Sequence, residues 1–234
     1  QLINDNCHAI GASYNKNKGY GSKFADIVTH SYHPVKNITT AEGGAILTNN
    51  KSIYEEVKLL RSHGINRKSL KLKTKETWNY EIKNIGYNYR LSDLQSALGI
   101  SQLKRLNKFV TLKNKIAKFY DRNLRNSKAI ILPREKKEIK HAYHLYPVRI
   151  KFDKIKVNKS ELFFKMKKKG INLQVHYVPL YKHKYLKEKL KFKEKDFPNT
   201  SLFYKEAVSL PIYANLSIAD QKYVIQSLQE IVKL

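Results

Sequence analysis

Hydrophobic and polar positions in the first half of the chain form short β-type runs separated by helical stripes. Residues 27–33 are rich in β-branched and aromatic side chains, and residues 45–48 form a short apolar run bounded by glycine and asparagine, so both ranges are predicted strands. Apolar side chains recur at helical spacing over residues 51–63 and again, behind a Ser-x-x-Gln capping box, over residues 94–124. This order of strands and helices is typical of an α/β domain.

The second half of the chain has the pattern of a smaller α+β unit. Polar and apolar residues alternate over residues 144–152, which predicts a strand, and residues 171–177 and 208–213 read as two more. Helices are predicted between and after these strands, beginning at Asn158, covering residues 199–207, and beginning again at Ser217.

The two patterns predict two domains. Residues 1–125 are assigned to part of a large α/β domain that ends in a long connecting helix, and residues 126–234 to a small C-terminal α+β domain. Residues 65–84 are polar, rich in lysine and without clear periodicity. We expect them to form an excursion on the surface, with Trp78 and Tyr80 as its anchors.

Positive charge is the strongest compositional signal. The formal net charge is +27, from 46 Lys and Arg against 19 Asp and Glu, and such a balance can mark a protein that binds nucleic acid or another polyanion. Eight of the basic residues are arginine, which groove-reading proteins favour, and the lysines are spread along the chain. We therefore expect a solvated surface without nucleic acid as a partner. A non-catalytic polyanion-binding module, with residues 165–169 and 182–195 as its densest basic runs, is the alternative.

Cysteine content and hydropathy restrict the other possibilities. Cys7 is the single cysteine, which excludes an internal disulfide and a cysteine-based zinc site and suits a reducing compartment. No apolar run approaches the roughly 18 residues that span a membrane. No second histidine, cysteine or carboxylate accompanies His176 at metal-ligand spacing. We expect a cytoplasmic protein with neither a membrane partner nor a metal.

One lysine lies in a tight connection between the two predicted strands of the first domain. Residues 31–44 read Ser-Tyr-His-Pro-Val-Lys-Asn-Ile-Thr-Thr-Ala-Glu-Gly-Gly, with Pro34 and the Gly43–Gly44 pair marking the turns. Backbone on both sides would hold Lys36, which suits an amine that does covalent chemistry. Taken alone, the pattern also fits a solvated lysine in a loop.

Five ordered motifs resemble those of the nucleotide-sugar aminotransferases of the DegT/StrS type. Residues 31–44 resemble the segment in which a lysine of that family binds its cofactor. Residues 5–12 (Asp-Asn-Cys-His-Ala-Ile-Gly-Ala) and residues 86–99, which begin Gly-Tyr-Asn-Tyr-Arg, resemble two further family segments. Residues 174–180 (Gln-Val-His-Tyr-Val-Pro-Leu) and 209–213 (Ser-Leu-Pro-Ile-Tyr) complete the set, which spans nearly all of the chain.

The resemblance implies a fold and a cofactor. The fold would be the C-terminal portion of a fold-type I transferase, with part of a large α/β domain and a small α+β domain, and the cofactor would be pyridoxal 5′-phosphate. Lys36 would bond covalently to that cofactor and act as the catalytic base and acid. Asp5 would pair with the pyridine nitrogen. The remaining implied contacts are His8, Ser31 and Asn88 for the cofactor, and Gln174, His176 and Tyr177 for the substrate.

Plainer interpretations of these residues stay open on the sequence alone. Asp5 could close an Asx turn at a strand end, and Asn88 could be an ordinary turn residue ahead of a helix. His8 and His176 could be structural histidines in a core.

The resemblance also implies a substrate and an assembly. The motif wording is most similar to the branch that aminates UDP-4-keto-6-deoxy-N-acetyl-hexosamine, with glutamate as amino donor, on the pseudaminic acid route of polysaccharide biosynthesis. A GDP- or dTDP-linked 4-keto or 3-keto sugar is the alternative within the family. Asn88 would reach the cofactor phosphate of a neighbouring subunit, so a homodimer is expected. A further family segment would precede residue 1, and this chain alone is expected to lack part of the cofactor pocket and to be inactive.

Overall fold

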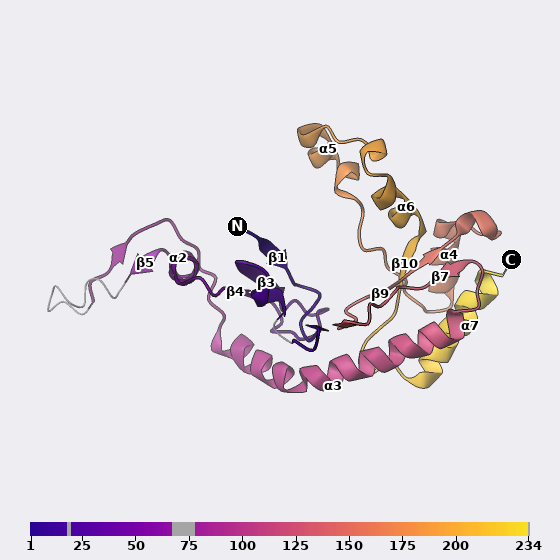
Figure 1. The fold of residues 1–234 in the computed structure, drawn as a ribbon, viewed down its shortest axis with the longest axis horizontal. Helices are drawn as coiled ribbons and strands as arrows, with labels where there is room; N and C mark the ends of the chain where they lie inside the picture. Colours follow the sequence, from indigo (N-terminus) through magenta and orange to yellow (C-terminus); the bar gives the residue numbers. More distant parts are fainter. Residues whose placement is uncertain (18–19, 67–77, 234) are drawn as a thin grey trace. The chain divides into compact units, whose positions relative to one another are not determined.

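The computed structural model describes residues 1–17, 20–66 and 78–233, and it divides into two compact units (Figure 1). Unit 1 comprises residues 1–107 and 138–140, and unit 2 comprises residues 108–137 and 141–234. The long helix α3 (Asp93–Leu124) contributes its first half to unit 1 and its second half to unit 2. The predicted division of the chain into domains after residue 125 stays a prediction.

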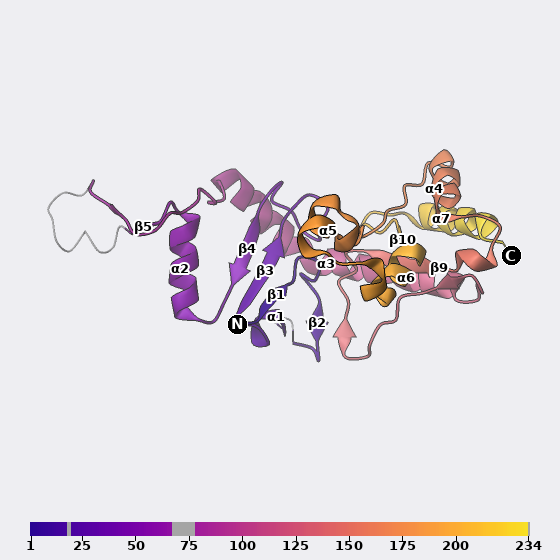
Figure 2. The same ribbon diagram turned by 90° about the horizontal axis from the view of Figure 1, so that it is seen from above.

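Unit 1 is built on a sheet of three strands in the order β1 (Ile3–Asp5), β3 (Ile27–Ser31) and β4 (Gly44–Leu47). β1 runs parallel to β3 and β4 antiparallel to it, so that the three lie side by side (Figure 2). The two strands predicted for this unit are therefore confirmed. Its other elements are the pair β2 (Ser13–Tyr14) and β8 (Ile139–Lys140), the pair β5 (Ile65–Asn66) and β6 (Glu81–Ile82), and helices α1 (Tyr20–Lys23) and α2 (Lys51–Arg61).

Unit 2 holds an antiparallel sheet in the order β10 (Ala207–Leu210), β9 (Tyr146–Ile150) and β7 (Ile130–Ile131). Side chains of β9 alternate as predicted, because Tyr146, Val148 and Ile150 are fully buried in the core. The helices of this unit are α4 (Lys159–Lys168), α5 (Lys184–Leu190), α6 (Pro198–Glu206) and α7 (Ile218–Ile231), with short 3-10 turns η1 (Phe152–Lys154), η2 (Leu180–Lys182) and η3 (Glu194–Asp196).

The helix starts follow the capping residues of the sequence. Ser92 and Gln95 form the predicted box ahead of α3, since the Ser92 N–H donates to Gln95 Oε1 at 2.9 Å and the Gln95 N–H donates to Ser92 Oγ at 3.3 Å. Asn158 caps α4 in the same way with Glu161. Each cap satisfies backbone N–H groups that the first helical turn leaves without a partner.

The apolar stripe of α3 is buried over its second half only. Ile116, Tyr120 and Leu124 lie in the core of unit 2, where the Tyr120 hydroxyl donates to the Pro211 carbonyl at 2.8 Å. In unit 1 the stripe stands open, and Leu94, Ile100 and Leu103 are 85%, 59% and 55% exposed. The same periodic pattern therefore produces a packed face in one unit and an uncovered apolar face in the other.

Two predictions from the sequence are wrong. Residues 171–177 do not form a strand; their alternation reflects the burial of Ile171 and Leu173, while the backbone pairs with a neighbour at Gln174 alone. Trp78 and Tyr80 are not anchors, because they are 76% and 50% exposed. Residues 67–77 of that excursion lie outside the described residues. No helix in the described ranges has the length and apolar character needed to cross a membrane.

Lys113 should make the free energy of unfolding depend on pH. It is 6% exposed on α3, and burial lowers the pKa of its amine to about 8. Because an unfolded chain would keep this proton up to about pH 10.5, the free energy of unfolding should rise with pH between about 8 and 10.5. Lys113→Met should flatten that rise and stabilise the protein at pH 7 by roughly 1–3 kcal/mol.

Urea unfolding at several pH values between 7 and 10 measures the effect. Lys118→Met, on the exposed side of the same helix, is the control and should leave the pH dependence as it is. Parallel pH profiles for the natural protein and Lys113→Met would contradict a lowered pKa at Lys113.

Candidate active site

The parallel pair of strands brings several predicted residues to one edge of the unit 1 sheet. Asp5 ends β1 and Ser31 ends β3, and because the strands are parallel their carboxyl ends meet at the same edge. Lys36 follows in the connection from β3 to β4. Residues distant in sequence thus share one side of the sheet.

Asp5 is held by its neighbour Cys7. The Cys7 N–H donates to Asp5 Oδ1 at 3.1 Å, while the Cys7 sulfur lies 3.8 Å from both the carbonyl and the hydroxyl oxygen of Thr29 on β3. The hydrogen bonds from Cys7 hold the pKa of Asp5 below its usual value, and the charges of His8 and Lys36 act in the same direction. Asp5 is therefore an anion at neutral pH, within electrostatic reach of His8 and Lys36.

The connection that carries Lys36 is closed by hydrogen bonds across its base. The Tyr32 carbonyl accepts from the Thr40 N–H at 3.0 Å and from the Thr39 hydroxyl at 2.9 Å, and the Tyr32 N–H donates to Gly43 at 2.8 Å. Within the loop, the Lys36 N–H donates to the His33 carbonyl at 2.9 Å. Lys36 is half-buried. Its backbone is held on both sides, as the sequence predicted.

Gly44 permits the close return of the chain to β3. A Cβ atom at this position would lie 2.6 Å from the carbonyl oxygen of His30, closer than side-chain carbons approach backbone. Gly44 therefore serves the packing of β4 against β3.

Ser31 and Asn88 occupy separate parts of unit 1. Ser31 Oγ accepts from the His33 N–H at 3.4 Å, near the start of the lysine connection. Asn88 is exposed on the segment ahead of α3 and pairs through its backbone with Ser62, which caps the end of α2. In the structure the charges of His8 and Lys36 reach Asp5, Ser31 lies at the same sheet edge, and Asn88 stands on an exposed segment.

The predicted substrate residues gather in unit 2. Gln174 pairs through its backbone with Ser209 on β10, and His176 Nδ1 lies 2.8 Å from Ser209 Oγ. The rings of His176 and Tyr177 meet edge to face with centroids 4.8 Å apart, and Tyr177 is 64% exposed. The segment thus presents one held imidazole beside one exposed phenol.

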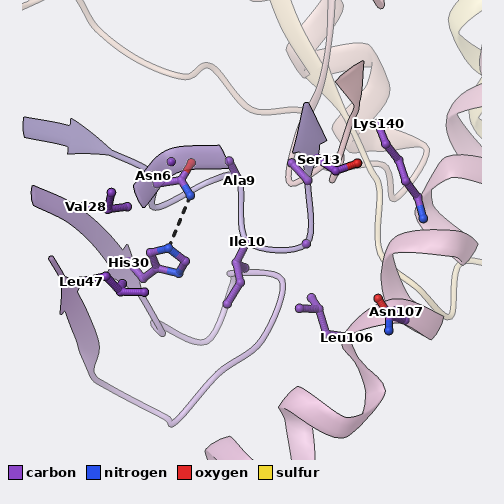
Figure 3. Close-up of a pocket in the computed structure, with 13 residues that line it drawn as sticks. Asn6, Ala9, Ile10, Ser13, Val28, His30, Leu47, Leu106, Asn107 and Lys140 are labelled. Atoms are coloured by element: carbon purple, nitrogen blue, oxygen red, sulfur yellow. Dashed lines mark hydrogen bonds between the residues drawn. The ribbon is translucent and has the colours of Figure 1, made fainter. Parts of the chain in front are cut away.

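A pocket of about 240 Å³ lies on the face of the unit 1 sheet opposite to Thr29 and Ser31 (Figure 3). Val28 and His30 line it, whereas Thr29 and Ser31 alternate to the opposite face. The Asn6 amide lies 3.4 Å from His30 Nε2, and burial lowers the pKa of His30. Asp5, Ser31 and Lys36 do not line this pocket.

Sequence reasoning missed Cys7, Thr29 and Ser209 as contacts of the predicted residues. Cys7 stands two positions after Asp5, where an Asx-type hydrogen bond is common, so that contact had a local signal. The Thr29 and Ser209 contacts depend on strand pairing between distant segments.

The chain belongs to the DegT/DnrJ/EryC1/StrS aminotransferase family, whose model matches residues 1–229. The predicted family and fold class are therefore confirmed, and this family uses pyridoxal phosphate.

Two similar proteins match nearly the whole of this chain. A Campylobacter jejuni protein named UDP-4-amino-4,6-dideoxy-N-acetyl-beta-L-altrosamine transaminase is 40% identical over 232 residues, which cover 99% of this chain and 58% of that protein. Uncharacterized protein MJ1066 of Methanocaldococcus jannaschii is 39% identical over 232 residues, 99% of this chain and 60% of that protein. This chain thus spans 58–60% of the length of these two relatives.

Solved structures share the fold. Helicobacter pylori PseC, described as an aminotransferase involved in the biosynthesis of pseudoaminic acid, matches 98% of this chain and 59% of its own with a TM-score of 0.87 and 33% identity. The sugar aminotransferase Spr1654 from Streptococcus pneumoniae, described as putative and solved in its PMP-form, matches 98% of this chain and 58% of its own with a TM-score of 0.89 and 27% identity.

Cys7 offers a chemical test of the Asp5 environment. Burial raises the pKa of the Cys7 thiol, and its hydrogen bond to Asp5 adds to the rise. Alkylation by iodoacetamide at neutral pH should be on the order of tenfold slower than for a free thiol, since the thiolate is the reactive form. Asp5→Asn should speed the reaction by removing the neighbouring negative charge.

The rate of labelling is followed by mass spectrometry of the peptide that contains Cys7. Asp93→Asn, which removes an exposed carboxylate at the start of α3, serves as control. Equal rates in Asp5→Asn and Asp93→Asn would show that Asp5 does not act on the thiol.

Proposed function

We propose that this protein is a pyridoxal-phosphate-dependent aminotransferase that moves an amino group from glutamate to the 4-keto carbon of UDP-4-keto-6-deoxy-N-acetyl-hexosamine. Its support is the family match over residues 1–229 and the names of relatives at 33–40% identity. The observation that carries it is the Asp5 carboxylate at the sheet edge from which the connection with Lys36 leads, where the charge of Lys36 helps to lower the pKa of Asp5. GDP- and dTDP-linked keto sugars are the competing substrates.

The residues present fit the cofactor. An anion such as Asp5 keeps a pyridine nitrogen protonated, and Cys7 fixes one oxygen of that carboxylate. The Ser31 hydroxyl would donate to phosphate oxygens, the amine of Lys36 would bond covalently, and His8 would support Asp5. When bound, the cofactor supplies an electron sink for the charge that develops as a carbon–hydrogen bond breaks.

Lys36 moves the protons of the reaction. Its Nζ takes the proton from the α-carbon of glutamate, and in the second half of the reaction it returns a proton to the sugar carbon that receives nitrogen. A backbone held across the base of the loop limits the positions that this amine can reach.

Gln174, His176 and Tyr177 are the proposed contacts of the nucleotide sugar. Amide, imidazole and phenol groups can each form hydrogen bonds with hydroxyl or diphosphate oxygens.

The cytoplasmic location stays a prediction.

A homodimer is the proposed assembly. Asn88 is exposed on the segment that leads into α3, where the apolar stripe with Leu94, Ile100 and Leu103 is uncovered. Exposed apolar faces of this kind mark contact surfaces, and a second copy of this chain would cover the stripe while Asn88 reaches its partner's cofactor phosphate.

Covalent trapping tests the proposed function. The protein is mixed with pyridoxal phosphate, reduced with borohydride and mapped by mass spectrometry. We expect the cofactor mass on the peptide that contains Lys36, and loss of both adduct and transamination in Lys36→Ala. Lys51→Ala, on the exposed side of α2, should keep both. Modification scattered over many lysines would contradict the proposal and favour the polyanion-binding module.

Subunit mixing tests the shared site. Lys36→Ala and Asn88→Ala should each be impaired alone. Dimers formed by random exchange of the two should regain about a quarter of the natural activity, because half of them are mixed and each mixed dimer has one intact site. No recovery, despite mass-spectrometric proof of exchange, would place Asn88 and Lys36 of one site in the same subunit or remove Asn88 from it.

A further inference from the structure

Ser209 is fixed in position by backbone contacts on both sides. It lies on β10, where it is 6% exposed and stands opposite Pro147 of β9. On its other side its N–H donates to the Gln174 carbonyl at 2.8 Å, and its carbonyl accepts from the Gln174 N–H at 3.3 Å. A residue paired in this way places its side chain with little freedom.

The hydroxyl of Ser209 meets the imidazole of His176. Its Oγ lies 2.8 Å from His176 Nδ1, which is a good hydrogen-bond distance. The bond can run in either direction. If Nδ1–H donated, the hydroxyl hydrogen of Ser209 would need a second acceptor, and the described structure gives that hydroxyl no other hydrogen bond. A buried donor without an acceptor is unfavourable because it loses its hydrogen bonds to water without replacement, so the serine is the donor.

We propose that Ser209 is a positioning residue that fixes the tautomer of His176. By donating to Nδ1 it keeps the ring proton on Nε2, so His176 acts as a hydrogen-bond donor at Nε2. A donor suits the oxygen-rich hydroxyl and diphosphate groups of a nucleotide sugar, whereas a bare nitrogen would repel phosphate oxygens. The nucleotide sugar as the ligand of His176 rests on the proposed function, whereas the tautomer of His176 does not.

Ser209→Ala removes the donor and leaves the ring in place. Long-range proton–nitrogen NMR of the histidine rings, with His176 assigned by the signal missing in His176→Gln, reports which nitrogen carries the proton. We expect Nε2–H in the natural protein and a mixture with Nδ1–H in Ser209→Ala. The KM for the nucleotide sugar should rise on the order of tenfold, while the rate of the half-reaction with glutamate stays unchanged.

Two further variants separate this role from packing. Ser227→Ala removes another buried serine hydroxyl, at 1% exposure on α7, and should change neither the tautomer nor KM. Ser209→Thr keeps the hydroxyl donor and should show the same His176 tautomer and the same KM as the natural protein. Thermal melting of each variant confirms that it is folded.

An unchanged tautomer in Ser209→Ala, or an equal rise in KM in Ser227→Ala, would overturn the role of Ser209 and leave the proposed aminotransferase intact. If the protein does not transaminate at all, the proposed function fails, and the NMR comparison still decides whether Ser209 fixes the ring.

Discussion

The parallel pairing of β1 with β3 is the constraint on which the candidate site depends. Three residue pairs set Asp5 opposite Thr29, and from that register follow the Cys7 contact with Thr29, the edge shared with Ser31, and the approach of Lys36 to a carboxylate. A slip by one residue would turn Asp5 and Cys7 to the face that carries His30. The chemistry of this chain is therefore set by a very short ladder of backbone hydrogen bonds.

The two units contribute different kinds of group. Unit 1 gathers an anion and an amine at a sheet edge, and unit 2 gathers hydrogen-bonding side chains around Ser209. An electrostatic interaction distinguishes Lys36 from the many other lysines of the chain. The chain carries +27, and the charge of Lys36 helps to lower the pKa of Asp5. Lys36 is therefore a candidate because of its position near the Asp5 carboxylate, which Cys7 holds, and not because lysine is abundant.

Local signals predicted much of the fold. The caps at Ser92 and Asn158 and the alternation in β9 were readable because the stabilising partners lie within a few residues. Residues 171–177 were misread because alternation records burial of Ile171 and Leu173, whereas a strand also needs a neighbour to pair with. The candidate site residues were proposed from ordered motifs. Their supporting contacts were not, because Cys7 with Thr29 and Ser209 with His176 are made by segments 22 and 33 residues apart.

The uncovered stripe at the start of α3 has a consequence for how such a protein would behave on dilution. If a second copy covers this stripe and supplies Asn88, then assembly and completion of the site are one equilibrium, and a separated subunit loses a ligand for its cofactor together with its apolar cover. Activity per molecule would then fall as the protein is diluted below its dissociation constant. In the cell, the amount of protein made would set the working fraction as well as the number of sites.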